Sequence, residues 1–378
     1  MTEKQRLYYL DNLKVLLIGL VIMHHVGQAY GATGGSWVYA YPGDRVKELG
    51  YLFRFDAAFF MGLFFFISGY FLPRSYDRHG ARKFIADKLI RFGIPVVFGA
   101  LVMMPVMEYV KYLHYTGDIS FRDFYVRHWF GYAPDTAVPG RVFNIAHLWF
   151  IEHLLIYSLL YAAVRTLLQE QPPSASIPTT RKARLYAIIP YIVLLGAVTH
   201  LMRTSWGFPI DRVIFPLGFI QIEPAHIPQY LSLFIIGILT YRWSLLESLT
   251  TPRNMLWFLF GVGIFVISIA TVYIIDSRHA FSLWEYREAL LCVGVSIGLL
   301  ALFHTYFNRT GRIMQVLTEN VFGTYIIHVP VVVALQYAFD PVKAGAFTLF
   351  AVVTLLSIPG SFLASILLRL IPGMKRIL

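Results

Sequence analysis

Long apolar runs, separated by short polar segments, dominate the hydrophobic pattern of this chain. A helix needs about 20 mostly apolar residues to cross the roughly 30 Å hydrocarbon core of a bilayer. Ten runs come close to this requirement, at residues 13–30, 52–72, 89–110, 143–166, 185–203, 228–243, 255–275, 286–307, 320–339 and 345–371. The pattern predicts an all-α polytopic membrane protein with about ten transmembrane helices, in which residues 1–378 form a single integral-membrane domain.

Composition and charge agree with this class. Only 14% of the 378 residues are charged, whereas soluble domains carry about 25%. The net charge of +11 is uneven, because 19 of the 32 lysines and arginines lie in segments on the side of the N-terminus. Positive charge gathers on the cytoplasmic side of a membrane. We therefore expect both termini in the cytoplasm, the lipid bilayer as a partner, and no nucleic acid.

Polar residues inside the apolar runs are costly, so they are the first candidates for function. In the first run, Lys14 and His25 are eleven residues apart, which is three helical turns plus about 20° and about 16 Å along the axis. They would share one face, where Lys14 could meet the phosphates of a long anionic donor and His25 its reactive end. The phosphopantetheine arm of coenzyme A has about this reach. Alternatively, Lys14 pairs with Asp11, and His25 is a packing residue. His24 points about 100° away and is expected to be structural or to support the site from behind.

The fourth run contains a glutamate among histidines. Glu152 is expected to pair with a cation such as His25 or Lys14, or to orient the catalytic histidine as a carboxylate does in a triad. In the ninth run, His328 precedes Pro330, so it either lines a cavity or makes a structural hydrogen bond. A His-Glu-x-x-His order is absent from the sequence, and with a single cysteine, Cys292, no metal site is expected.

A basic segment follows the second run. Positive charge on the cytoplasmic side explains most of it, but Lys88 and Arg91 could also bind a phosphate by charge-assisted hydrogen bonds. Within the second run, Ser68-Gly69 would allow two helices to approach closely. The candidate cavity-lining residues are Ser68, His147, Trp149, Tyr325 and His328.

Taken together, these motifs resemble the acyltransferase-3 family of integral membrane acyltransferases. Leu10-Asp11-Asn12-Leu13-Lys14, followed after ten residues by His25, is similar to its Arg/Lys-x10-His signature. Later elements also resemble the family in order along the chain: Phe64 to Phe71, Lys88 to Pro95, His147 to Phe150, and Tyr325 to Pro330. The chain looks closest to the branch with glucan-modifying, succinyltransferase-like members.

The resemblance implies an O-acyltransferase of the plasma membrane, the inner membrane of a bacterium. It would move an acyl group, acetyl or succinyl, from cytoplasmic acyl-CoA to a hydroxyl of an extracytoplasmic glycan or other cell-envelope acceptor. Acyl-CoA is a co-substrate, and no bound cofactor is expected. His25 is similar to the family's essential histidine, Lys14 to its basic partner, and Arg91 to the arginine near the donor. Lysine in place of the more usual arginine at position 14 loses bidentate phosphate recognition.

A transporter or flippase without chemistry is the alternative, because buried ionisable groups in a many-helix protein are also typical of carriers. Two similar halves are not visible in the sequence, which favours the enzyme. The two functions differ in one observable respect, since only an acyltransferase consumes acyl-CoA and releases a free thiol.

Overall fold

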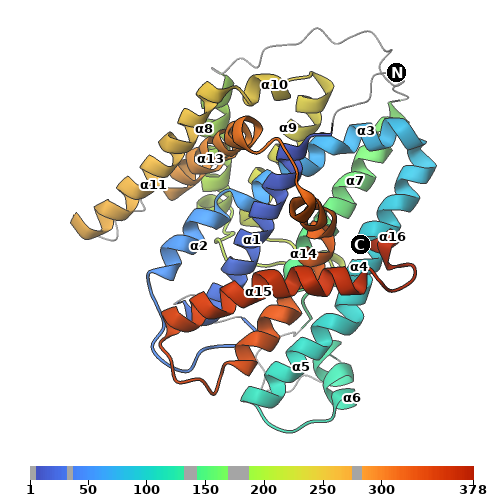
Figure 1. The fold of residues 1–378 in the computed structure, drawn as a ribbon, viewed down its shortest axis with the longest axis vertical. Coiled ribbons are helices and arrows are strands. Elements are labelled where there is room, and N and C mark those ends of the chain that lie inside the picture. The colour runs from blue at the N-terminus through green and yellow to red at the C-terminus, as the bar shows by residue number, and fades with distance from the viewer. Residues whose placement is uncertain (1–5, 32–36, 132–142, 169–186, 275–282) are drawn as a thin grey trace.

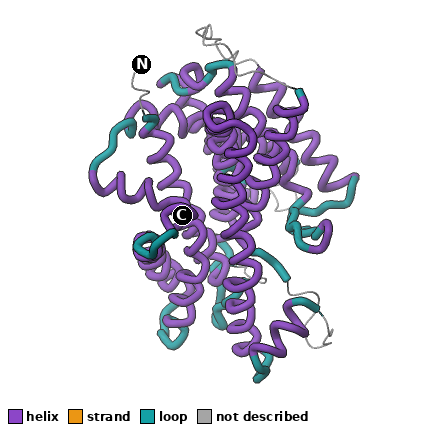
Figure 2. Tube along the Cα trace, turned by 90° about the vertical axis from the view of Figure 1, so that its right-hand side faces the viewer, coloured by secondary structure: helices purple, strands orange, loops and turns teal. Residues whose placement is uncertain are grey.

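The computed structural model describes residues 6–31, 37–131, 143–168, 187–274 and 283–378. Helices make up nearly all of the regular structure in these ranges (Figure 2). The described residues contain no named strand, only two isolated bridges, Gly31 to Val46 and Ile214 to Ile222. The fold therefore has to be understood from how apolar helices pack.

Every predicted apolar run coincides with a helical segment. In chain order these segments are α1 (Tyr8–Tyr30); α2 (Leu49–Ala57) with α3 (Phe60–Lys88); the short helices η2 (Leu89–Gly93), α4 (Ile94–Phe98), η3 (Gly99–Met103) and α5 (Met104–Tyr115); η5 (Ala146–Leu148) with α7 (Trp149–Leu167); α8 (Ile188–His200) with η7 (Leu201–Ser205); α9 (Ile227–Arg242); η10 (Pro252–Met255) with α11 (Leu256–Ile274); α13 (Trp284–Tyr306); α14 (Arg312–Ala338); and α15 (Ala346–Leu368). Shorter helices in the connections are α6 (Phe121–Asp123), η4 (Phe124–Trp129), η8 (Pro216–Gly218), η9 (Pro224–His226), α10 (Leu246–Leu249) and α16 (Met374–Ile377).

Eight helical stretches of the described residues are long and apolar enough to cross a membrane. One of them, Leu49–Tyr115, has 67 residues, which is far more than one crossing of a roughly 30 Å core requires. Another predicted span, α9, has only 16 residues. The prediction of an all-α polytopic membrane protein is confirmed.

Helix α1 runs through the centre of the bundle (Figure 1). It packs against α2, α3, α13, α14 and α15. Its apolar residues are buried on several faces, including Leu13, Leu17, Ile18 and Ile22, none of which is exposed. A helix that is apolar all round is stable only when surrounded by others. The polar groups of α1 are thereby held between helices rather than facing lipid.

Helices α3 and α9 approach each other closely through glycines. A Cβ on Gly69 would overlap the carbonyl oxygen of Phe234, and a Cβ on Gly237 would overlap that of Phe66. Small residues at such crossings let two backbones meet. This confirms the interpretation of Ser68-Gly69 as a site of close helix approach.

A bend within α3 sets the position of the basic segment. Gly80 has φ 71° and ψ 165° inside the helix, a conformation that glycine adopts at little cost. The chain then continues through residues 81–88 into η2 and α4, which lead down the molecule to α5 (Figure 1). Lys88 and Arg91 lie about two to three turns past this bend, where α3 continues into η2.

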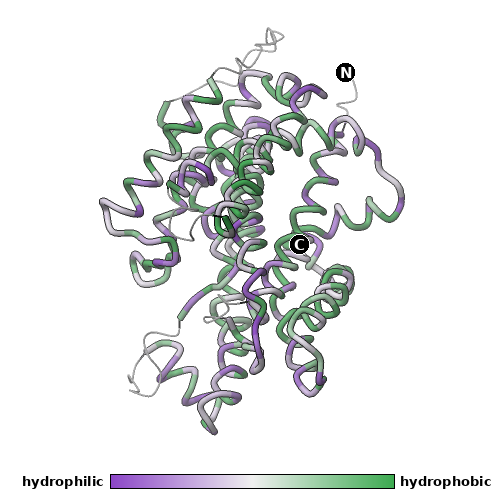
Figure 3. Tube along the Cα trace, turned by 90° about the vertical axis from the view of Figure 1, so that its left-hand side faces the viewer, coloured by the Kyte–Doolittle hydropathy of each residue, from purple (hydrophilic) through white to green (hydrophobic). Residues whose placement is uncertain are grey.

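Hydrophobic residues are frequent along most of the helices (Figure 3). On α11 and α15, large side chains such as Leu259 and Leu355 are 66% and 72% exposed. In lipid, exposed apolar side chains carry no penalty, because lipid tails are as apolar as leucine. These helices are therefore expected to face lipid tails.

Candidate active site

Three histidines from distant parts of the sequence meet inside the bundle. His25 comes from α1, His147 from η5 and His328 from α14. The Nδ1 atom of His25 lies 3.0 Å from the Nε2 atom of His328. The ring of His147 is centred 4.7 Å from that of His328 and 6.2 Å from that of His25. His147 and His328 are buried, whereas His25 is only half-buried. Of the three histidines, His25 is thus the one that retains exposed surface.

Hydrogen bonds to main-chain carbonyls determine the protonation pattern of this group. The Nδ1 atom of His328 is 2.6 Å from the carbonyl oxygen of Tyr325. Because a carbonyl only accepts, Nδ1 of the neutral ring carries the proton and Nε2 is an acceptor. His25 must then donate its Nδ1–H to His328. The Nε2 atom of a neutral His25 makes no side-chain hydrogen bond with the described residues, so its lone pair can accept a proton or attack a carbonyl carbon.

Pro330 explains how His147 is held. Proline has no N–H, so a helix that contains it leaves the carbonyl four residues earlier without its usual donor. In α14 that carbonyl belongs to Ile326, and the Nε2 atom of His147 lies 3.0 Å from its oxygen. The hydroxyl of Tyr325 donates to the carbonyl of His147. The sequence Tyr325 to Pro330 therefore ties η5 and α14 together around His25.

His24 and His25 make different contacts, because successive residues of a helix point about 100° apart. The Nδ1 atom of His24 lies 2.9 Å from the Oδ1 atom of Asp56, whose side chain is 1% exposed. This pair joins α1 to α2. His24 is thus a structural partner next to the site.

The expected contact of Glu152 with His25 or Lys14 is not found among the described residues. Its Oε2 atom accepts a hydrogen bond of 2.9 Å from the backbone N–H of Gln221, and the side-chain oxygen of Gln221 accepts from the N–H of Ile145 at 2.9 Å. Within the described ranges, the side-chain partner of the His25 ring is His328 and not a carboxylate, and the ring also hydrogen-bonds to the backbone of Val21 one turn earlier. Glu152 lies one and a half turns beyond His147, so it faces the connection before α9 and anchors that connection to the start of α7.

Lys14 makes the contact that the simpler interpretation predicted. Its Nζ atom lies 3.0 Å from the Oδ1 atom of Asp11 and 4.8 Å from the centre of the Phe71 ring. Helix α1 is uninterrupted from Tyr8 to Tyr30, so Lys14 and His25 are about 16 Å apart along its axis. Arg91 is close enough to act electrostatically on Lys14.

Around Arg91, cations from several elements gather and outnumber the acid next to them, Asp87; we call this the basic end. Lys88 lies over the rings of Phe84 and Phe92, and Arg91 over Phe322 at 4.9 Å. Among the described residues, neither Lys88 nor Arg91 has a carboxylate within ion-pair distance. Such unmatched cations are suited to bind phosphate groups.

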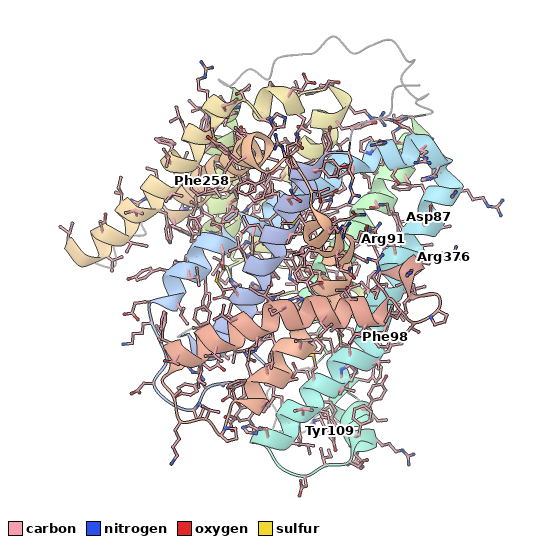
Figure 4. The ribbon with its side chains drawn as sticks, viewed as in Figure 1. Asp87, Arg91, Phe98, Tyr109, Phe258 and Arg376 are labelled. Carbon is pink, nitrogen blue, oxygen red and sulfur yellow. The ribbon has the colours of Figure 1, made fainter. Side chains whose placement is uncertain are left out.

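The C-terminal part of the chain contributes further cations to the basic end. Arg369 follows α15 and interacts electrostatically with Arg91. Helix α16 packs against η2, and Figure 4 shows Arg376 beside Arg91 on the same flank of the molecule. Nothing in the sequence indicates that residues 369–376 fold back onto η2.

The other candidate residues lie apart from the histidines. Trp149 stacks on Tyr230, with ring centres 5.3 Å apart and planes at 20°. Ser68 is half-buried on α3 and makes no hydrogen bond with the described parts of the chain. Neither belongs to the group around His25. The structure adds Trp37, which stacks on His25 at 5.2 Å; its position in a connection gave no periodic signal.

No group of three or more His, Cys, Asp or Glu within the described ranges is arranged to hold a metal ion. The histidine rings are instead joined to one another and to main-chain carbonyls. Such an arrangement suits proton transfer and nucleophilic chemistry.

Comparison with known proteins gives the family. The sequence model of an acyltransferase-3 family, described as "Acyltransferase domain", matches residues 7–367. Glucans biosynthesis protein C of Escherichia coli (strain K12) is 22% identical over 339 residues, which cover 86% of this chain and 82% of the relative. The proteins of that name from E. coli O9:H4 (strain HS) and E. coli (strain SMS-3-5) give the same values. No solved structure matches significantly. The chain belongs to the acyltransferase-3 family and is a multi-pass membrane acyltransferase.

Proposed function

We propose that this enzyme transfers an acetyl or succinyl group from acyl-CoA to a hydroxyl group of a glycan, with His25 as the proton acceptor. The observation that carries the proposal is the bond between His25 Nδ1 and His328 Nε2 at 3.0 Å. It leaves the Nε2 lone pair of His25 free while fixing the plane of its ring. A neutral imidazole is an effective base near pH 7.

In the reaction, Nε2 of His25 removes the proton of the acceptor hydroxyl as its oxygen attacks the thioester carbonyl. His328 accepts the Nδ1–H bond, which strengthens when His25 becomes an imidazolium. The proton then passes from Nε2 to the thiolate that leaves. The charge on His25 is therefore stabilised by a fixed dipole rather than by a carboxylate.

The basic end supports coenzyme A as the donor. Lys88 and Arg91 form no ion pair in the described part of the chain, although Asp87 acts electrostatically on Lys88, so the phosphates of coenzyme A would neutralise them. From Lys14 near this end, α1 leads over about 16 Å to His25, a distance that the extended pantetheine arm covers. Positive charge favours the cytoplasmic side; we accordingly assign the basic end to the cytoplasm and the enzyme to the plasma membrane.

The acceptor is inferred from two considerations. The relatives carry the name glucans biosynthesis protein C, which points to a glucan as their substrate. The opposite end of α1 leads to the connection at residues 37–48, where an extracytoplasmic glycan would approach His25. We therefore propose a polymeric glycan hydroxyl as the acceptor.

The test is thiol release by the purified protein in nanodiscs, with acetyl-CoA or succinyl-CoA as donor and cell-envelope glucan as acceptor. Wild type should release thiol and acylate the glucan, and His25→Ala should do neither while remaining monodisperse. His200→Ala is the matched control, because His200 pairs with Glu285 elsewhere in the bundle and should leave activity unchanged. Normal activity of His25→Ala would refute the role of His25. Movement of unmodified substrate without thiol release would instead establish a transporter.

A further inference from the structure

One face of the His25 ring is covered by an aromatic side chain that no part of the proposed mechanism uses. The indole of Trp37 and the imidazole of His25 have centres 5.2 Å apart and planes inclined by 22°. Trp37 is half-buried. It lies at the end of α1 opposite to Lys14, because Gln336 joins its indole to Val26.

A chain of hydrogen bonds fixes the orientation of this indole. The Nε1–H group of Trp37 donates to the Oε1 atom of Gln336 at 2.9 Å, and the Nε2 atom of Gln336 donates to the carbonyl of Val26 at 3.2 Å. Gln336 has no exposed surface. Val26 directly follows His25, so these bonds connect the indole to the same turn of α1 that carries the imidazole.

Residues 37–41, which we call the strap, are tied to the helix ends around them. Tyr39 donates to Asp340 at 2.5 Å, Tyr41 to the carbonyl of Ala344 at 2.9 Å, and Tyr337 to the carbonyl of Val38 at 3.1 Å. Burial and the Asp340 carboxylate raise the pKa of Tyr39, so its hydroxyl stays protonated and keeps donating. The strap is thus held on α14 and on the start of α15, with Trp37 pressed against His25.

This placement matters because water competes with the acceptor. A base that activates a glycan hydroxyl can equally activate water, and a transferase must keep water away from its donor. An apolar indole over the imidazole removes one approach for water while the Nε2 edge stays available. We propose that Trp37 is a positioning residue that suppresses hydrolysis of the donor. This inference rests on the proposed role of His25.

The reaction that Trp37 would prevent is ordinary thioester hydrolysis. The oxygen of water attacks the acyl carbonyl, and Nε2 of His25 takes a proton from that water. The C–S bond breaks, and the proton passes to the thiolate sulfur. The products are the free carboxylic acid and coenzyme A with a free thiol, so hydrolysis without acceptor is visible in the same thiol assay.

A purely structural role predicts a different result. If Trp37 only stabilised the strap, its removal would lower transfer and hydrolysis together, because both depend on His25. If Trp37 excludes water, its removal lowers transfer but raises hydrolysis. A gain of hydrolysis cannot arise from loss of folded enzyme, because both activities require the folded site.

The experiment compares Trp37→Ala and Trp37→Phe with wild type in nanodiscs, with and without glucan acceptor. Trp37→Ala should raise acceptor-independent thiol release about fivefold or more and lower the acyl-glucan formed per thiol. Trp37→Phe keeps an aromatic ring but loses the bond to Gln336, so its hydrolysis should lie in between. Trp206→Ala is the control, since Trp206 is 60% exposed and remote in sequence from the strap.

The outcomes separate this inference from the proposed function. The double variant His25→Ala/Trp37→Ala should release no thiol, because acceptor-independent hydrolysis of the donor requires His25. Wild type that transfers normally, with hydrolysis unchanged or reduced in both Trp37 variants, would overturn the inference and leave the acyltransferase function standing. Wild type that releases no thiol even with acceptor would overturn the proposed function, and this inference with it.

Discussion

The orienting role of His328 can be separated from its structural role by two similar substitutions. His328 makes two bonds: its Nδ1–H donates to the Tyr325 carbonyl at 2.6 Å, and its Nε2 accepts from His25 at 3.0 Å. The amide nitrogen of asparagine can replace Nδ1, and the amide oxygen of glutamine can replace Nε2. His328→Asn therefore keeps the bond to Tyr325, and His328→Gln keeps the acceptor for His25.

The size of the effect follows from the charge on His25. In the transition state His25 is an imidazolium, and a hydrogen bond to a charged group contributes about 1.5–3 kcal/mol. Since 1.36 kcal/mol corresponds to a factor of ten in rate, His328→Asn should lower kcat by about 10- to 150-fold. His328→Gln should keep most of kcat but remove the side-chain donor to the Tyr325 carbonyl, which retains its helical donor, at a cost of about 0.5–1.5 kcal/mol in stability.

The assay is glucan-dependent thiol release, with thermal unfolding measured on the same nanodisc samples. The reasoning predicts that the Gln variant is more active but less stable than the Asn variant. The reverse order of activities would show that His328 acts only by holding Tyr325, and the assignment of His25 Nδ1 as a donor would be abandoned. As a further check, His25→Ala/His328→Asn should be no slower than His25→Ala, because residues that act as one unit are not additive.

Three other substitutions test separate parts of the structure. Arg91→Gln should raise KM for acyl-CoA about tenfold with little change in kcat, because it removes a charge-assisted phosphate contact; the effect should shrink with added salt, and Arg253→Gln, away from η2 in the sequence, should not show it. Glu152→Gln should keep nearly normal kcat, because an amide oxygen still accepts from Gln221; a loss of about 10⁴-fold, as for a triad carboxylate, would restore Glu152 as the partner of His25. Gly69→Val should lower the thermal midpoint or prevent folding, since its side chain would overlap the Phe234 carbonyl of α9, whereas Gly50→Ala, with open space around it, should be nearly neutral in the same unfolding assay.

Most of the fold was accessible from the sequence, because in a membrane protein the pattern is strongly constrained. Backbone polar groups cannot stay unpaired in hydrocarbon, so a long apolar run has to be helical. Within the described ranges, each of the ten predicted runs falls largely on helical segments, and residues 185, 186 and 275 of these runs lie outside those ranges. The sequence could not locate the bend at Gly80 or the packing of α16 on η2, since both depend on contacts between distant segments.

The candidate site shows the same division. The histidine at position 25 could be found because an ionisable residue inside an apolar run is costly and therefore conspicuous. The glutamate at position 152 was conspicuous for the same reason, yet its carboxylate bonds to Gln221. An intramembrane polar residue indicates that a partner exists, but sequence distance does not identify that partner.

The sequence by itself thus determined the class of the protein, its helical segments and the choice of His25 as the candidate catalytic residue. Only the tertiary structure decided which groups surround that imidazole: His328 on its Nδ1 edge and Trp37 on one face. These residues lie 303 and 12 positions away along the chain. The apolar period along a helix reports which face is buried, and it carries no information about which residue of another helix will meet that face.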